Sequence, residues 1–123
     1  MKAKRTSYNC PVEAAIDVMG GKWKPLILWW LHSKGALRFG ELRKLMPGVT
    51  EKMLTQHLRE MERDGIVDRR VFAVVPPKVE YSLTEYGRTL KRALNAICEW
   101  GRLHMERNHV TQKAPVVMLR KPA

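Results

Sequence analysis

Residues 39–64, FGELRKLMPGVTEKMLTQHLREMERD, contain two stretches of helical periodicity separated by a turn. In the first stretch, the apolar side chains recur at the spacing of one short amphipathic helix: Phe39, Leu42, Leu45 and Met46. Pro47-Gly48-Val49 is typical of a turn, with Gly48 available for a positive φ. Thr50 is a good N-cap for a second helix that extends to about Asp64. A short helix, a tight glycine-containing turn and a second amphipathic helix together predict a helix-turn-helix.

The second of these helices has one apolar and one polar side. The residues expected to face inward are mainly apolar: Met53, Leu54, His57, Leu58 and Met61. The opposite side carries polar residues at positions i, i+3, i+4 and i+7: Lys52, Thr55, Gln56 and Arg59. An α-helix fits the major groove of DNA, where glutamine pairs with adenine and arginine or lysine pairs with guanine. A solvated helix face is the alternative, but the preceding helix and turn favour DNA contact, with Thr50 offering its backbone N–H or hydroxyl to a phosphate.

The periodicity changes from helical to alternating after Gly65. Residues 66–71 and 79–83 are expected to form two strands, and the loop of residues 72–78 between them contains Pro76-Pro77. A hairpin directly after the second helix of a helix-turn-helix is typical of the wing of a winged-helix domain.

Four basic residues around this hairpin are candidates for contacts with DNA: Arg38, Arg69, Arg70 and Lys78. Arg69 and Arg70 are consecutive in a strand and point to opposite faces, so one of the two is expected to reach DNA. Lys78 lies beside the rigid Pro76-Pro77 and is better placed for the backbone or the minor groove. Arg38 precedes the first helix of the motif and is a further candidate for a phosphate contact.

Helices are also predicted near both ends of the chain. Cys10 lies at the cap position of a helix that begins at Pro11 and stops at Gly20-Gly21. Thr84 is expected to cap a long last helix that ends near Asn108. One stripe of that helix is formed by Leu90, Leu94, Ile97 and Gly101. The element order predicts a mostly α-helical α+β fold with a small hairpin, a winged helix-turn-helix.

The chain has 123 residues and a net charge of +11, with 23 Lys+Arg against 12 Asp+Glu. This length fits one domain. We expect a winged helix-turn-helix at residues 10–107, between a basic arm at residues 1–9 and a flexible basic tail at residues 108–123. The two flanking segments hold six of the eleven surplus charges, so the charge indicates a polyanionic partner only weakly.

Several classes of protein are not indicated by the sequence. Residues 1–9 are polar and lack the apolar core of a secretory signal, and the apolar run of residues 25–31 is too short to cross a bilayer. Cys10 and Cys98 make neither a disulfide framework nor a metal-ligand cluster, so a cytoplasmic location is the default. No P-loop, glycine-rich dinucleotide turn, His-x-x-x-His pair or Cys-x-x-Cys motif is present, so neither an enzyme nor a cofactor is expected.

Four segments form a specific combination of motifs: Cys10-Pro11-Val12-Glu13, Gly20-Gly21-Lys22-Trp23, Leu37-Arg38-Phe39-Gly40-Glu41-Leu42, and Pro76-Pro77-Lys78-Val79-Glu80-Tyr81-Ser82-Leu83-Thr84-Glu85-Tyr86-Gly87. They resemble the HxlR family of bacterial transcription regulators, and the resemblance extends from about Cys10 to Gly101. It implies a dimeric winged-helix repressor or activator whose first and last helices pair across the dimer. Trp29-Trp30 is bulkier than the residues that the family pattern has at this place, and residues 108–123 lie outside that pattern. These two departures affect the expected dimer surface and any ligand cavity.

Cys10 is the candidate for redox sensing. A thiol at a helix N-cap, close in sequence to Lys2, Lys4 and Arg5, experiences a positive potential that favours the thiolate, the form that oxidants and electrophiles attack. The resemblance adds that several HxlR-type regulators sense such reagents through a cysteine at this place. A plain reduced thiol is the alternative, and Cys98 is expected to be a packing residue.

Two effector models remain open. In one, modification of Cys10 moves the first helix, alters the dimer and changes the spacing between the second helices of the two helix-turn-helix motifs. In the other, a small apolar or aromatic molecule binds between the last helix and three tryptophans, for which core and dimer packing is the competing interpretation: Trp23, Trp29 and Trp30.

The favoured function is a sequence-specific double-stranded DNA-binding transcription regulator, a repressor that binds an inverted-repeat operator as a homodimer. A non-specific architectural nucleic-acid-binding protein is the main alternative, and a winged helix used only for protein–protein contact is the third. The mixed polar stripe on the second helix of the motif favours base reading over blanket phosphate binding.

Overall fold

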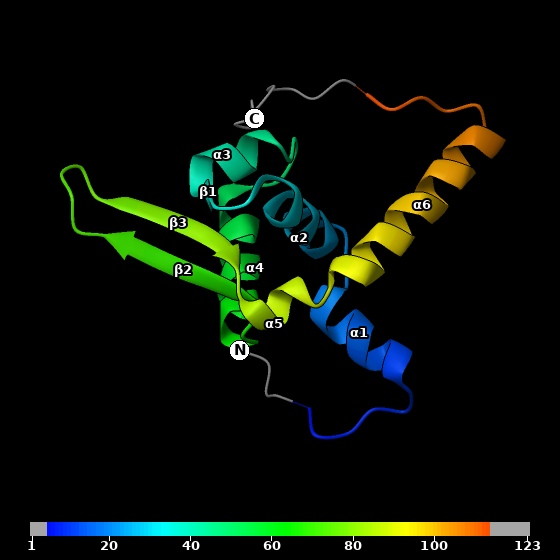
Figure 1. Ribbon diagram of the computed structural model, residues 1–123, viewed down its shortest axis with the longest axis horizontal. Coiled ribbons are helices and arrows are strands. Elements are labelled where there is room, and N and C mark those ends of the chain that lie inside the picture. Colours follow the sequence, from blue (N-terminus) through cyan, green and yellow to red (C-terminus); the bar gives the residue numbers. More distant parts are fainter. Residues whose placement is uncertain (1–4, 114–123) are drawn as a thin grey trace.

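The protein is a winged helix, with helices packed around the base of a small antiparallel sheet (Figure 1). The computed structural model describes residues 5–113, so the first part of the predicted basic arm and the last part of the predicted tail lie outside the described residues. The elements follow in the order α1 (Pro11–Met19), α2 (Trp23–Lys34), β1 (Leu37–Arg38), α3 (Phe39–Lys44), α4 (Glu51–Arg63), β2 (Val67–Phe72), β3 (Lys78–Leu83), α5 (Glu85–Arg88) and α6 (Lys91–Arg107).

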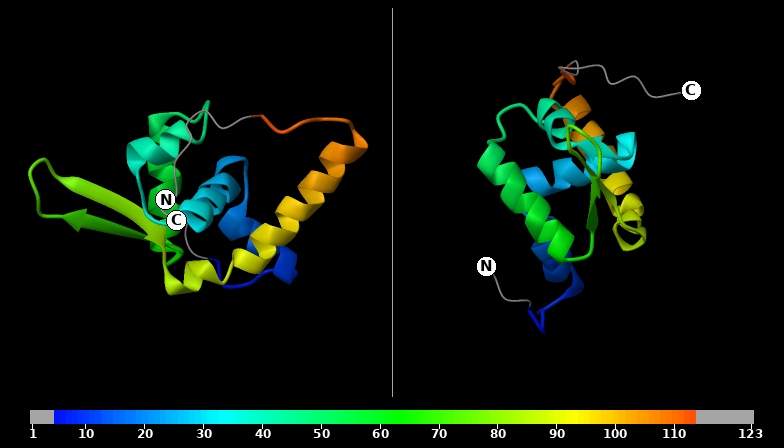
Figure 2. Two further views of the ribbon diagram at one scale, coloured as in Figure 1. Left: turned by 45° about the horizontal axis from the view of Figure 1, so that its top comes forward. Right: turned by 90° about the vertical axis from the view of Figure 1, so that its left-hand side faces the viewer.

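The sheet is antiparallel, with strand order β1-β3-β2. β2 and β3 form the predicted hairpin, in which Arg70 pairs with Glu80 and Phe72 pairs with Lys78. The short strand β1 was not predicted, and it pairs Arg38 with Glu80 on the other side of β3. Two further views show the hairpin projecting from one side of the molecule and α6 from the other (Figure 2). The hairpin is therefore available to a partner that approaches its side.

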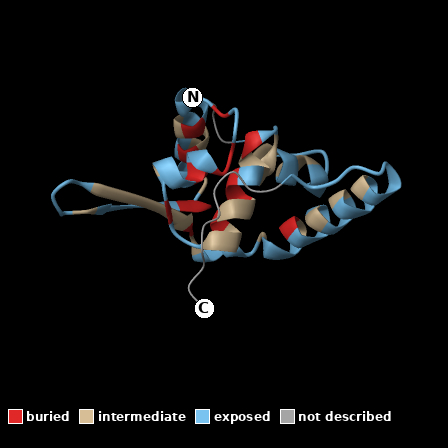
Figure 3. Cartoon of the chain, turned by 90° about the horizontal axis from the view of Figure 1, so that it is seen from above, coloured by how far each residue is buried: buried red, intermediate tan, exposed pale blue. Residues whose placement is uncertain are grey.

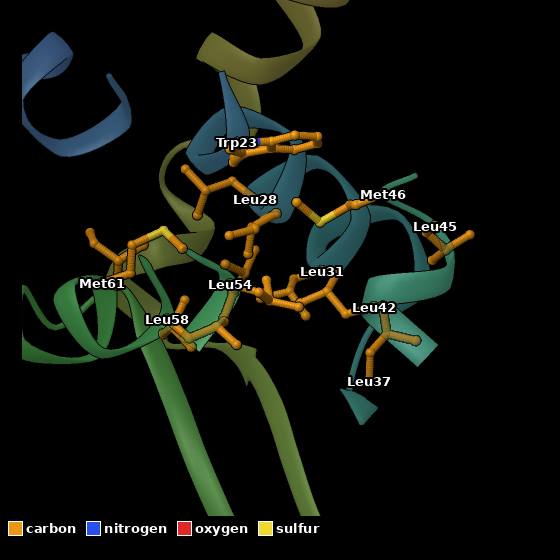
Figure 4. Close-up of a cluster of buried hydrophobic side chains, with 14 of the residues drawn as sticks. Trp23, Leu28, Leu31, Leu37, Leu42, Leu45, Met46, Leu54, Leu58 and Met61 are labelled. Atoms are coloured by element: carbon orange, nitrogen blue, oxygen red, sulfur yellow. The ribbon is translucent and has the colours of Figure 1, made fainter. Parts of the chain in front are cut away.

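The core lies between α2, α3, α4 and the base of the hairpin (Figure 3). The largest side chains with almost no exposure come from each of these elements: Ile27, Leu28, Leu42, Met46, Leu54, Leu58, Met61 and Val67. Side chains from α2, α3 and α4 point toward one another in this cluster, with the ring of Trp23 at its edge (Figure 4). Burial of this apolar surface fixes α4 on its inner side and leaves the other side outward.

The predicted long helix after Thr84 is divided, which corrects the sequence-based expectation. The Thr84 hydroxyl oxygen accepts the N–H of Gly87 at 2.9 Å and so caps α5, which contains four residues. The N–H of Leu90 then donates to the carbonyl of Gly87 at 3.1 Å, a three-residue spacing that tightens the turn and ends the helix. α6 begins at Lys91 and leaves the body of the protein in a new direction (Figure 1).

Candidate nucleic-acid interface

The turn between α3 and α4 has the conformation that its sequence predicts. Gly48 has a φ of +96°, a region that favours glycine. Val49 is buried and its N–H donates to the carbonyl of Met46 at 3.1 Å. The Thr50 hydroxyl oxygen accepts the N–H of Met53 at 3.1 Å, so Thr50 is the N-cap of α4. Together these contacts fix the direction in which α4 leaves the turn.

The polar stripe of α4 faces outward. Lys52, Gln56 and Arg59 are exposed and Thr55 is half-buried. With three further residues of the helix, these four line a single open hollow on the protein surface: Glu51, Lys52, Thr55, Gln56, Arg59, Glu60 and Arg63. The structure therefore brings all four predicted stripe residues together on one accessible side of α4.

The apolar side of α4 deviates from the prediction at its margins. Leu54, Leu58 and Met61 are buried as expected, but Met53 is 38% exposed. His57 was expected to face inward; it is half-buried, and among the described residues its buried Nδ1 makes no hydrogen bond. Oε1 of Glu60 lies 3.6 Å from that nitrogen. His57 and Glu60 are both half-buried and thus lie at the border between the buried and the exposed side of α4.

The hairpin register divides the four predicted wing cations between two faces. Residues directly opposite each other in an antiparallel pair share one face of the sheet. Arg38 and Arg70 both lie opposite Glu80, so all three share a face, and Lys78 lies two residues from Glu80 on that same face. Arg69 lies opposite Tyr81 on the other face. Three of the four cations therefore belong to one surface.

Two charged features of this region were missed from the sequence. Arg43 of α3 lies with Nη1 3.6 Å from Oε2 of Glu51, a pair that joins the two helices of the motif. Arg63 lines the same hollow as Lys52 and Gln56. Arg63 continues the stripe by four residues after Arg59, so its position was readable from the helical period. The Arg43–Glu51 pair depends on the angle between α3 and α4, which the sequence does not give, so this pair could not be predicted.

Cys10 is exposed and lies at the N-cap of α1, as predicted. Arg5, one of the cations expected near its thiol, instead pairs with Glu13, its Nη2 2.8 Å from Oε1. Hydrogen bonds from the backbone and side chain of Asn9 to Glu13, followed by the charge of Arg5, lower the pKa of that carboxyl. The other two predicted cations, Lys2 and Lys4, lie outside the described residues.

Cys98 and the three tryptophans of the predicted ligand site are each half-buried or buried. Cys98 is half-buried on α6, where the Arg102 Nη2 group lies 3.8 Å from Sγ. Trp23 is buried in the core, and Trp29 and Trp30 pack half-buried against it. All three tryptophans of the predicted ligand site therefore contact the core.

Within residues 5–113, no group of three or more His, Cys, Asp and Glu side chains is placed to hold a metal ion. None of the helices in that part of the chain has the length and apolar character needed to traverse a lipid bilayer.

Comparison with known proteins identifies a family whose sequence pattern matches most of this chain. Residues 18–109 match the family model described as HxlR-like helix-turn-helix. Over 104 residues the chain is 52% identical to the uncharacterised HTH-type transcriptional regulator YtcD of Bacillus subtilis strain 168, covering 85% of this chain and 82% of that protein.

Solved structures of similar sequence have the same architecture. The redox regulator HypR in its reduced form superposes with a TM-score of 0.76 at 48% identity, covering 81% of this chain and 98% of that one. The oxidised form of HypR gives a TM-score of 0.73 at 47% identity, with coverages of 85% and 100%.

Proposed function

The chain belongs to the HxlR-like helix-turn-helix family of DNA-binding transcriptional regulators, and from that premise we propose that it is a repressor that reads an inverted-repeat operator as a homodimer. The orientation of α4 carries this proposal. Its apolar side is held in the core, and its polar side is accessible along the length of the helix. An exposed α-helix of this kind has the dimensions of the major groove.

The proposal assigns a contact to each candidate residue. Lys52, Thr55, Gln56 and Arg59 enter the major groove, and Thr50 contacts a phosphate where α4 begins. The backbone is held by the cations that share one face of the sheet: Arg38, Arg70 and Lys78. Because Arg69 points to the other face, Arg70 is the member of that consecutive pair that we assign to DNA.

A selection experiment tests this function. The protein is used to select duplexes from a random library, and the selected duplex is then competed with excess mixed-sequence DNA. A regulator keeps its preferred duplex, whereas an architectural protein shows no preference and a protein-interaction module binds neither DNA.

Two substitutions on α4 refine the test. Gln56→Ala should weaken binding to the selected duplex about 5–100-fold and leave mixed-sequence binding nearly unchanged, because a bidentate base contact is specific. Lys52→Ala should weaken binding to both duplexes, because it removes a positive charge from the helix face that meets DNA. Lys91→Ala removes the same charge from exposed α6 and is the matched control. Equal behaviour of Gln56→Ala and wild type on the selected duplex would contradict base reading by α4.

The homodimer is proposed to form through α1 and α6, within a unit of residues 10–107. Among the described residues of α1, none is buried, and Val12 and Ile16 are 65% and 60% exposed. On α6, Trp100 and Leu103 are 64% and 60% exposed. Apolar side chains gathered at this exposure favour burial against another protein surface. A two-fold dimer would place two copies of α4 on half-sites about 34 Å apart along one side of DNA.

Thiol sensing through Cys10 is proposed as the regulatory input. This cysteine is exposed at the start of a helix assigned to the dimer, and the similar protein HypR is named as a redox regulator. Oxidation or alkylation of Cys10 is expected to move α1, change the spacing of the two α4 helices and release DNA. A small apolar or aromatic effector is the alternative input.

Diamide treatment distinguishes these inputs. Diamide takes two electrons and two protons from a pair of thiols and is itself reduced to the hydrazine, so the proposed product is a disulfide between Cys10 of one protomer and Cys10 of its partner. Wild-type binding to the selected duplex should fall on treatment and recover with dithiothreitol, while Cys10→Ser should bind equally with and without diamide. Cys98→Ser is the matched control for the second thiol and is expected to respond as wild type does. Equal binding of wild type and Cys10→Ser under both conditions would remove the thiol model.

A further inference from the structure

Phe72, near the outer end of β2, has two cations over its aromatic ring. The guanidinium carbon of Arg70 lies 4.8 Å from the ring centroid, and Nζ of Lys78 lies 4.6 Å from it. The register explains this cluster, because Phe72 lies two residues from Arg70 on β2 and directly opposite Lys78 on β3. All three side chains therefore come from one face of the hairpin.

Phe72 differs from an acidic partner in its effect on these cations. An aromatic face attracts a cation through its quadrupole and restricts where the charge can lie. The ring has no net charge, so the cation keeps its full charge and its outward N–H donors. A carboxylate at the same place would occupy those donors and cancel the attraction to phosphate. Phe72 thus orders two cations and adds no negative charge of its own, whereas Oε2 of Glu80 lies 3.3 Å from Nζ of Lys78 and offsets part of its charge.

The location of the cluster fits a nucleic-acid backbone. Phe72 is half-buried and Arg70 is exposed, on a hairpin that projects beyond the helices (Figure 1). The same face carries Arg38, which lies opposite Glu80 on the other side of β3. A protein of this family approaches a polyanion, and ordered cations lose less side-chain entropy when they bind it.

We propose that Phe72 is the positioning residue of the wing, which holds Arg70 and Lys78 as an ordered pair of cations for one stretch of the DNA backbone. The inference rests on the proposed function, because it requires the wing to lie against DNA. It adds a residue that makes no polar contact with DNA itself and acts through two others.

The test compares Phe72→Leu, which removes the ring, with Phe72→Tyr and Phe72→Trp, which keep it. Binding is measured by fluorescence anisotropy with the selected duplex and with a mixed-sequence duplex. Phe72→Leu should weaken binding to both duplexes by a similar factor of about 3–10, because the cations contact phosphate. Phe72→Tyr and Phe72→Trp should stay within about twofold of wild type. Val71→Ala changes the neighbouring exposed residue on the other face and should bind as wild type.

A double-mutant cycle separates positioning from a purely structural role. In an Arg70→Gln, Lys78→Gln background, Phe72→Leu should have no further effect on DNA binding, whatever its effect on the melting temperature. An equal loss from Phe72→Leu in both backgrounds would overturn the proposal, as would wild-type affinity of Phe72→Leu. If Arg70→Gln and Lys78→Gln also bind as wild type, the wing face is not used and the proposal fails while α4 can still read DNA. Wild-type protein that binds neither duplex would instead overturn the proposed function.

Discussion

Lys24 of α2 and Glu60 of α4 form an ion pair at the border between the buried and the exposed side of α4, with Nζ 2.9 Å from Oε1. Their side chains are 12% and 27% exposed, so the pair is largely shielded from water. Nδ1 of His57 lies 3.6 Å from the same carboxylate oxygen. The pair joins the central helix of the core to the helix that is proposed to enter DNA, and it holds that helix against the body of the protein.

Replacement of Lys24 by methionine should destabilise the fold. The change keeps most of the apolar stem but leaves the Glu60 carboxylate without its ion-pair partner, which costs about 1–2 kcal/mol. The free energy of unfolding is measured by urea denaturation. Lys91→Met removes a cation from an exposed position and is the control, for which a change below about 0.5 kcal/mol is expected. Equal stabilities for the two variants would contradict a structural role for the pair.

Acid should weaken the fold through the same carboxyl. The hydrogen bond from Lys24, followed by its positive charge, lowers the pKa of Glu60 from its ordinary value of 4.5. A carboxyl with a lower pKa in the folded state stabilises the protein above its unfolded pKa and loses this contribution as pH falls through the folded pKa. Wild type should therefore lose more stability than Glu60→Gln as pH is lowered from about 5 to about 3. Urea denaturation across this range checks the difference, and parallel curves for the two proteins would refute it.

The helix-turn-helix could be predicted because its signals are local. The spacing of Leu54, Leu58 and Met61, the cap at Thr50 and the glycine at position 48 are all encoded within a few residues of the structure they produce. The same reasoning identified the outward stripe, since a helix fixed on one side by its core residues must expose the opposite side.

The features that could not be predicted depend on distant parts of the chain. Strand β1 contains only Leu37 and Arg38 and exists through pairing with Tyr81 and Glu80, far along the sequence. Arg70, Phe72 and Lys78 lie close together because of the register in which β2 and β3 pair. The alternation of polar and apolar residues in the sequence does not fix this register to a single residue. The division between α5 and α6 was missed because Thr84 and the apolar stripe also suit one continuous helix. Tertiary contact decided each of these cases.

Gly87 should be intolerant of a larger residue. A Cβ atom at this position would overlap the carbonyl oxygen of Ile66, which belongs to backbone and cannot move aside as a flexible side chain can. Gly87→Ala is expected to lower the free energy of unfolding by about 1–3 kcal/mol, as overpacking of a buried site does. Gly40→Ala is the matched control, because a Cβ there meets no atom within 4 Å among the described residues. A Gly87→Ala protein as stable as Gly40→Ala would contradict the close contact.

Trp100→Glu should convert the proposed dimer to a monomer. The indole is exposed on α6 and stacks on His104 with ring centroids 5.3 Å apart, so the substitution removes a large aromatic surface and introduces charge into an apolar contact. Sedimentation equilibrium measures the mass of wild type and variant, and circular dichroism checks that the variant is folded. Arg59→Glu on α4 introduces the same residue outside the proposed interface and should remain dimeric. A monomeric wild type, or a dimeric Trp100→Glu protein, would refute the assignment of α6 to the dimer.

Glu80→Gln should strengthen DNA binding. Oε2 of Glu80 lies 3.3 Å from Nζ of Lys78, and Arg38 and Arg70 lie opposite Glu80 on the two neighbouring strands. This carboxylate offsets part of the positive charge on the face proposed to meet the phosphate backbone. Its removal should raise affinity for both selected and mixed-sequence duplexes by about 2–10-fold near 0.1 M salt, with a smaller gain at higher salt.

The control for Glu80→Gln is Glu85→Gln, which makes the same change in net charge at an exposed residue of α5. Any gain from the overall charge of the protein appears in both variants, so the difference between them reports the local effect on the wing. Salt titrations followed by anisotropy give both affinity and its ionic-strength dependence. An affinity of Glu80→Gln no higher than that of Glu85→Gln would contradict the prediction that the face with Arg38, Arg70 and Lys78 meets the DNA backbone, because a charge removed next to bound phosphates must act more strongly than one removed at a distance.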